Sequence, residues 1–189
     1  MKPPDNKRLV VKSVVGLTLL LAVAGLTGLL FREPISAGAT WLYERLGLAG
    51  LFLGVLITDT SPLPLTHEPV LFLGVSAGED PWRILAVTAT ASVLAGPVGW
   101  SCGRLARRSR RLTHWLQRRF PEVVTFMDEH GAKGVAIAAL LPIPFAVSTW
   151  LAGLSTVRFG PLCAASLLRI PKTAFYLWLL VAGWSAGAP

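Results

Sequence analysis

The chain has 189 residues, of which 53% are hydrophobic and only 15% are charged. This composition is too apolar for a soluble domain and predicts an integral membrane protein. The net charge of +8 is concentrated beside apolar segments, and no recognition motif accompanies it, so we expect no nucleic-acid partner.

The first predicted element is a membrane-spanning helix over residues 13–31, which contain no charge and cover roughly 28 Å as a helix. A signal peptide is the alternative, but the apolar stretch is long for one. The basic segment 1–12 before the span then places the N-terminus in the cytoplasm. No linker divides residues 13–189, so we expect a single membrane domain.

The next apolar segment, residues 46–57, covers only roughly 18 Å as a helix and is too short to cross a bilayer alone. It is interrupted by TDTSPLPLTHEP, in which Pro62 and Pro64 each break helical hydrogen bonding. We therefore predict a re-entrant hairpin over about residues 46–78, entering from the outer face with its tip at membrane depth. One long kinked helix is the alternative.

Residues 83–103 are long enough to form a second span, which ends at the arginine-rich stretch 104–120. Leucines at helical spacing in that stretch predict an amphipathic helix at the cytoplasmic interface, facing anionic lipid headgroups. A short cytoplasmic helix follows, and Gly131 lies just beyond its expected end.

Pro142 and Pro144 lie between two short apolar segments, which predicts a second hairpin over about residues 132–155, entering from the cytoplasm. Residues 161–184 supply the last span. In this topology thirteen Lys and Arg residues lie on the cytoplasmic side and three on the outer side, as the positive-inside rule requires. The expected fold is an all-α membrane protein with about three spanning helices and two oppositely oriented hairpins.

The two hairpins have matching proline spacings. Pro62 is followed 19 positions later by Pro81, and Pro142 by Pro161, each at the start of a predicted spanning helix. Because one hairpin enters from outside and the other from inside, the two units would be inverted repeats. Inverted repeats with broken helices that meet near the midplane are a transporter architecture.

The segment LLPIPFAVSTWLAGLSTVRFGPLCAASLLRIPKTAFY resembles the second conserved block of the DedA/VTT superfamily, the SNARE-associated Golgi protein group, and especially its short YqaA-like branch. DTSPLPLTHEPVLFLGVSAG and the later GWSCGR are similar to the family's first hairpin and its exit. The matching residues of the second block are Pro142, Pro144, Ala152, Gly153, Phe159 and Arg169.

The resemblance implies translocation of a lipid or lipid phosphate, such as undecaprenyl phosphate, sometimes coupled to the proton gradient. It also implies a multi-pass protein of the bacterial inner membrane. The family's acidic Glu-x-x-x-Pro-x-Pro-Gly-Glu form is absent, as are the arginines around the second hairpin's proline. Arg169 and Lys172 would therefore supply the positive charge.

Charges inside the bilayer cost about 2.5 to 3.5 kcal/mol each, so pairing or function must offset them. We expect Arg169 and Lys172 to bind an anionic headgroup, while Asp59, His67 and Glu68 couple protons. The alternative is a set of buried ion pairs that clamps the first hairpin to the last span. The further predicted substrate-binding residues are Pro62, Pro64, Pro142, Pro144 and Gly153.

No other class of function has comparable support. The motifs HExxH and GxSxG are absent, so we expect neither an enzyme nor catalytic residues, although a membrane enzyme and a structural or assembly factor remain alternatives. We expect no cofactor and no metal site, because the acids and histidine at 128–130 have no matching ligands elsewhere. Cys102 and Cys163 are expected to be small buried residues. Membrane lipids are the expected partners, and a homo-oligomer is an open alternative.

Overall fold

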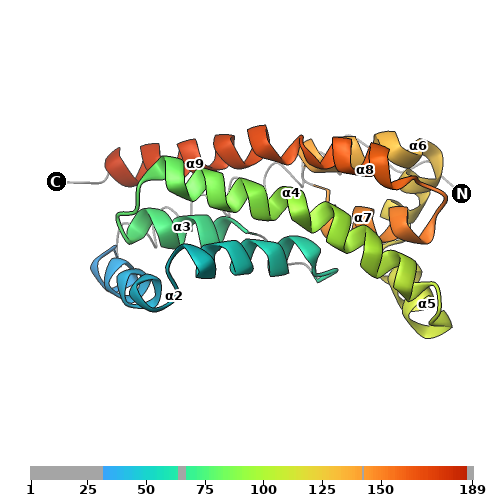
Figure 1. Ribbon diagram of the computed structural model, residues 1–189, viewed down its shortest axis with the longest axis horizontal. Coiled ribbons are helices and arrows are strands. Elements are labelled where there is room, and N and C mark those ends of the chain that lie inside the picture. Colours follow the sequence, from blue (N-terminus) through green and yellow to red (C-terminus); the bar gives the residue numbers. More distant parts are fainter. Residues whose placement is uncertain (1–31, 64–66, 142, 187–189) are drawn as a thin grey trace, which may run out of the picture.

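The computed structural model describes residues 32–63, 67–141 and 143–186, and these residues form helices without any strand. The predicted first span, residues 13–31, and the basic segment 1–12 lie outside this part of the chain. In order, the helices are α2 (Arg32–Thr60), α3 (Glu68–Ser76), α4 (Pro81–Ala106), α5 (Arg110–Arg119), α6 (Pro121–Leu140), α7 (Phe145–Leu154), α8 (Phe159–Ser166) and α9 (Arg169–Ala186). Helices α4 and α9 run side by side along the long axis (Figure 1).

Three helical stretches are long and apolar enough to cross a membrane: Thr40–Thr60, Pro81–Ala106 and Phe159–Ser185. They confirm the prediction of an all-α membrane protein. The last two correspond to predicted spans, whereas the first includes a segment that was predicted to be too short. Its helix is broken at Gly47, where φ is 53° and ψ is −154°. The unbroken part after Gly47 therefore covers only about 20 Å.

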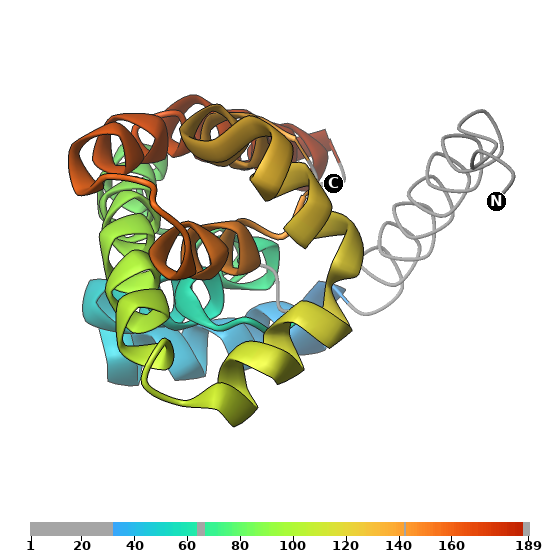
Figure 2. The same cartoon turned by 90° about the vertical axis from the view of Figure 1, so that its right-hand side faces the viewer.

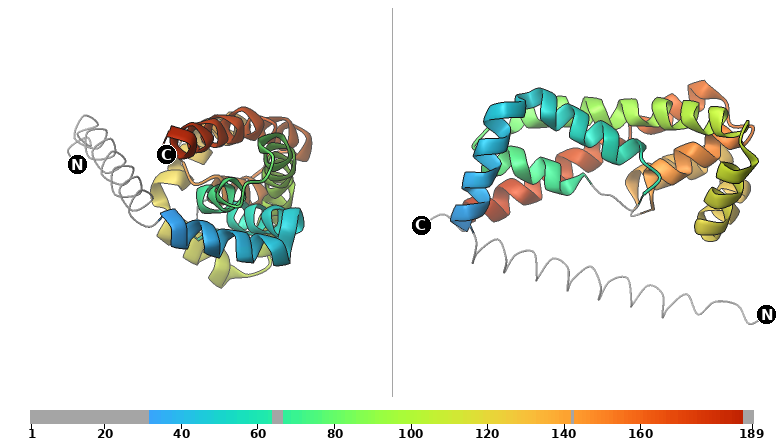
Figure 3. Two further views of the ribbon diagram at one scale, coloured as in Figure 1. Left: turned by 90° about the vertical axis from the view of Figure 1, so that its left-hand side faces the viewer. Right: turned by 90° about the horizontal axis from the view of Figure 1, so that it is seen from below.

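The first predicted hairpin is interrupted where its prolines lie. Helix α2 ends at Thr60, the chain bends at Ser61 to Leu63, and α3 begins only at Glu68. Helices α2 and α3 pack against each other (Figure 3). This excludes one continuous helix over residues 46–77.

The second hairpin repeats this plan. Helix α6 ends at Leu140, and Pro144 directly precedes α7, which packs against α6. Helix α6 is broken at Gly131, whose φ is again 53°, a left-handed conformation that glycine adopts without the steric cost of a side chain. The helix end predicted at Gly131 corresponds to this break. The part of α6 after Gly131 is the first helix of the hairpin. Each hairpin leads to a helix with a proline in its first turn, α4 or α8.

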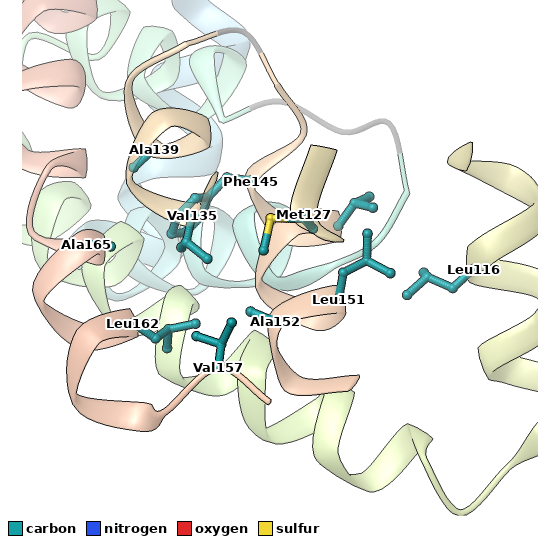
Figure 4. Packing of buried hydrophobic residues seen from close by; sticks show 11 residues of the cluster. Leu116, Met127, Val135, Ala139, Phe145, Leu151, Ala152, Val157, Leu162 and Ala165 are labelled. Atoms are coloured by element: carbon teal, nitrogen blue, oxygen red, sulfur yellow. The ribbon is translucent and has the colours of Figure 1, made fainter. Parts of the chain in front are cut away.

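Helix α7 forms the centre of the second half of the molecule and packs against α4, α6 and α2 (Figure 2). All its residues except Trp150 and Leu154 are buried. Figure 4 shows the surrounding core, in which Val157 and Leu162 lie close to Ala152 of α7. The centre is therefore fixed by packing on several sides of one short helix.

Helices α4 and α7 cross at backbone distance. A Cβ atom on Gly153 would lie 2.2 Å from the carbonyl oxygen of Trp100, and one on Gly103 would lie 2.1 Å from that of Trp150. Real side chains essentially never approach this closely, so both positions require glycine. Gly153, predicted as a substrate-binding residue, here permits the helices to cross.

The last predicted span contains a break between two helices. Helix α8 ends at Ser166 and α9 begins at Arg169. Pro171 has no N–H to donate to the carbonyl of Leu167, and its ring would collide with that carbonyl in a regular helix. The break places Arg169 at the first position of α9.

The arginine-rich stretch 104–120 was predicted as one helix. This prediction is wrong, because the stretch is divided between two helices. Helix α4 continues to Ala106, and a new helix, α5, begins after Ser109, whose hydroxyl accepts a hydrogen bond from the amide of Leu112 at 3.4 Å. The side chain of Arg107 turns back to donate to the carbonyls of the α7 end. Helix α5 itself is amphipathic as predicted, because its arginines are exposed while Leu116 is fully buried.

Candidate functional site

Four polar side chains from different elements are buried together, and we call them the Asp59 cluster. Asp59 lies near the end of α2, His67 just before α3, Ser92 in the middle of α4 and Arg169 at the start of α9. Their exposed fractions are 6%, 3%, 0% and 2%. Charged groups are rarely buried to this extent unless they are paired.

Both carboxylate oxygens of Asp59 are occupied. Oδ1 lies 3.0 Å from Nδ1 of His67, and Oδ2 accepts hydrogen bonds from the hydroxyl of Ser92 and from a terminal nitrogen of Arg169. Arg169 Nε donates to Ser92 Oγ at 2.8 Å. The carboxylate and the guanidinium are therefore joined both directly and through the serine.

His67 Nδ1 also lies 3.1 Å from a terminal nitrogen of Arg169. A neutral ring either donates from Nδ1 to Asp59 or accepts there from Arg169, depending on its tautomer. The imidazole therefore lies within hydrogen-bond distance of both members of the ion pair.

The second hairpin contributes an aromatic ring that contacts Arg169. The ring centroid of Phe145, the first residue of α7, lies 4.7 Å from Cζ of Arg169. A guanidinium over a desolvated ring gains cation–π stabilisation. Arg169 consequently contacts both hairpins and α4.

Two predicted site residues lie outside these hydrogen bonds. Lys172 donates instead to the carbonyl of Leu141 at the end of α6, at 2.8 Å. Glu68 has a buried Oε2 atom with no hydrogen-bond partner among the described residues, although Glu68 and Lys172 interact electrostatically. The structure brings together Asp59, His67 and Arg169, but it does not bring Glu68 and Lys172 into the cluster.

Two of the four predicted prolines, Pro62 and Pro144, lie in the described residues, next to hairpin helices, and form no observed hydrogen bond with the cluster. Pro62 lies in the bend after α2, and Pro144 lies exposed at the N-terminal end of α7. Pro64 and Pro142 lie outside the residues that the structure describes.

Sequence reasoning missed two contributors. Ser92 lies in the segment TATASVLAG, where several small hydroxyl residues follow one another and nothing distinguishes the one that faces Asp59. Phe145 directly follows Pro144 in the second predicted hairpin, but its contact with Arg169 depends on how the two halves pack. Neither contact has a sequence motif that would have predicted it.

Some further buried polar atoms in cluster residues, or in residues near them in the chain, have no hydrogen-bond partner among the described residues. They are Nε2 of His67 and the hydroxyl oxygens of Thr60 and Thr173. Thr173 follows Arg169 by one helical turn on α9. Most buried polar side-chain atoms in proteins have a hydrogen-bond partner, so these atoms are exceptions. Within the same described residues, no group of three or more His, Cys, Asp and Glu side chains could hold a metal ion.

Each hairpin's first helix ends on a carbonyl that receives a side-chain donor from another element. Trp150 Nε1 of α7 donates to the carbonyl of Thr60, the last residue of α2, at 2.8 Å. The bond from Lys172 to Leu141 serves the end of α6 in the same way. Both bonds satisfy carbonyls that have no partner within their own helix.

The model of the VTT domain family matches residues 63–182. No curated protein and no solved structure matches the chain. The matched region extends from the first hairpin's bend to within the last helix, and it contains His67, Ser92 and Arg169, while Asp59 lies just before it. The protein therefore belongs to the VTT domain family, the DedA/SNARE-associated family of membrane proteins, which are regarded as transporter-like and not as enzymes.

Proposed function

We propose that the protein is a lipid translocase that moves an anionic lipid or lipid phosphate, such as undecaprenyl phosphate, across the membrane. The observation that carries this proposal is the position of Arg169, buried at the junction of both hairpins, α4 and α9. A guanidinium stays charged at membrane depth and binds phosphate through two parallel hydrogen bonds.

Competition for Arg169 supplies a coupling mechanism. In the structure the carboxylate of Asp59 occupies the guanidinium, so a phosphate has to displace it. A proton on Asp59 removes the negative charge and weakens the ion pair, which frees hydrogen-bond donors for the headgroup. His67, 3.0 Å from the carboxylate, is placed to deliver that proton. Proton uptake and anion binding would then favour the same state.

A second candidate function follows from the completeness of the same hydrogen bonds. All four members of the Asp59 cluster are buried and paired with one another, as in a structural clamp. In that case the protein would be a non-transporting structural or assembly factor. Removing Arg169 from the ion pair should abolish transport if the cluster is a binding site. It should affect only stability if the cluster is a structural clamp.

The proposed function is tested with purified protein in phosphatidylcholine vesicles that contain a trace of a fluorescent anionic phospholipid or of undecaprenyl phosphate. We expect protein-dependent movement of the phosphate-bearing lipid between leaflets, faster when a proton gradient is imposed. A zwitterionic probe of equal chain length is the control. Folded protein that moves neither anionic lipid would refute the proposal.

We also propose that both hairpins are re-entrant and that α5 lies on the cytoplasmic side of a bacterial inner membrane, with the N-terminus on the same side. Gln117 on α5 and Trp82 at the start of α4 are both exposed and provide opposite markers. In a background without Cys102 and Cys163, a membrane-impermeant thiol reagent should reach Trp82→Cys from outside the cell. Gln117→Cys should react only in inverted vesicles, and the opposite pattern would reverse the topology.

A further inference from the structure

An open groove lies on α4 beside the turn between α8 and α9. Its volume is about 360 Å³, and its lining is almost wholly apolar. Helix α4 and the residues on either side of the turn form its walls, and both belong to stretches long enough to span a membrane. The residues that matter here are Ala86, Ala89, Thr90, Val93, Leu167 and Ile170.

The groove and the Asp59 cluster lie on opposite sides of the same helix seam. Ala89 and Val93 are neighbours of Ser92 on α4, and Leu167 and Ile170 lie on either side of Arg169 in the chain. Ser92 and Arg169 are buried and hydrogen-bonded to each other, whereas Ile170 is 44% exposed. One helix pair therefore presents its charge to the interior and its apolar side chains to the surrounding lipid.

The groove runs along the axis of α4, as a lipid hydrocarbon chain lying beside this helix would. On α4 it extends from Leu85, about one turn after the helix begins, to Leu94 near the middle, a rise of about 14 Å. Its inner end is at the level of Ser92 and Arg169. An apolar path thus leads from near one end of the span to the depth of the buried guanidinium.

We propose that this groove holds a hydrocarbon chain of the transported anionic lipid while the headgroup is bound at Arg169. This inference rests on the proposed function. A headgroup that enters the protein interior would otherwise draw its chain out of the hydrocarbon, at a cost for every methylene group. The groove lets the chain stay against apolar side chains and open to lipid while the phosphate crosses the seam.

The charge of the occupant follows from Arg169. Among the described residues it is the only Lys or Arg that is buried. A cation on the inner side of the seam favours a negative headgroup and gives a zwitterionic one less net attraction. The groove therefore belongs to an anionic lipid and is distinct from the general lipid contact of the exposed helix faces.

The direct test uses the wild-type protein in phosphatidylcholine vesicles with a phosphatidylglycerol that carries a photoreactive group in its chain. Crosslinks should concentrate on residues 85–94 and 167–170, and unlabelled phosphatidylglycerol should reduce them more than added phosphatidylcholine does. Val98 and Trp178, which are exposed elsewhere on α4 and α9, are the internal controls. Equal labelling of Val98 and Trp178, or equal competition by both lipids, would show only bulk lipid and overturn the proposal.

Filling the groove provides the functional test. Ala86→Trp and Thr90→Trp place a large ring at exposed positions of the groove, and Val98→Trp places the same ring on α4 outside it. The first two variants should slow translocation of the long-chain anionic lipid by roughly tenfold or more, and Val98→Trp should not. Full activity in both groove variants would refute the groove while leaving the translocase intact. If wild-type protein moves no lipid, the proposed function itself fails, while the crosslinking result still reports on the groove.

Discussion

Arg169→Ala should abolish translocation of anionic lipid in reconstituted vesicles. The side chain is the only buried cation among the described residues, and no neighbouring group in the cluster can replace its planar set of donors. The substitution also leaves the carboxylate of Asp59 buried without its cation. Breaking a buried ion pair in this way costs about 3 to 5 kcal/mol of stability, so translocation and thermal unfolding have to be measured on the same preparation.

Two companion variants separate transport from stability. Arg169→Lys keeps the positive charge but lacks the planar guanidinium with its paired donors. It should therefore retain more translocation than Arg169→Ala but less than the wild type. The double variant Arg169→Ala with Asp59→Asn removes both charges, so it should regain stability relative to Arg169→Ala yet remain inactive. A well-folded variant without Arg169 that moves lipid at the wild-type rate would show that the cluster is a clamp and not a binding site.

Asp59→Asn should make translocation insensitive to the proton gradient. The amide resembles the protonated acid in shape and charge, so Arg169 would no longer be held by a carboxylate and its donors would be available at any pH. The variant also buries an unpaired guanidinium, which should lower stability by about 3 to 5 kcal/mol. The measurement is the ratio of translocation rates with and without an imposed gradient, together with a thermal melt.

Glu68→Gln is the matched control for this prediction. Glu68 is a nearby acid on the same hairpin, but it forms no hydrogen bond with the cluster. Its substitution should leave the response to the gradient unchanged. If Glu68→Gln removes the response and Asp59→Asn retains it, the proton is carried by Glu68, and the competition mechanism at Arg169 is wrong.

The hairpin breaks could be predicted because their causes are local. A proline cannot donate a backbone hydrogen bond wherever it lies, so Pro62 and Pro144 indicate interruptions from the sequence alone. Gly131 likewise indicated a helix end. The break before Arg169 has an equally local cause in Pro171, and it lies within a segment that is as a whole long and apolar enough to span.

The site could be predicted only through its charges. An ionisable residue in a span is unusual, so Asp59, His67 and Arg169 were candidates before any contact was known. Ser92 is chemically ordinary in such a helix, and its role comes from the rotation of α4 against α2 and α9. Lys172 is as unusual as Arg169, but its long side chain reaches the end of α6, a contact that sequence spacing does not determine.

Side-chain donors bind the carbonyls at the ends of α2 and α6, and this links any separation of the helices to hydration of those carbonyls. Moving α7 away from α2 takes the Trp150 indole from the carbonyl of Thr60, and moving α9 away from α6 does the same at Leu141. Where lipid or apolar side chains surround it, an abandoned carbonyl would cost about 1 to 3 kcal/mol, whereas an arriving water molecule would replace the lost bond. We therefore expect any separation of these helices during the proposed translocation to be accompanied by water at the ends of α2 and α6.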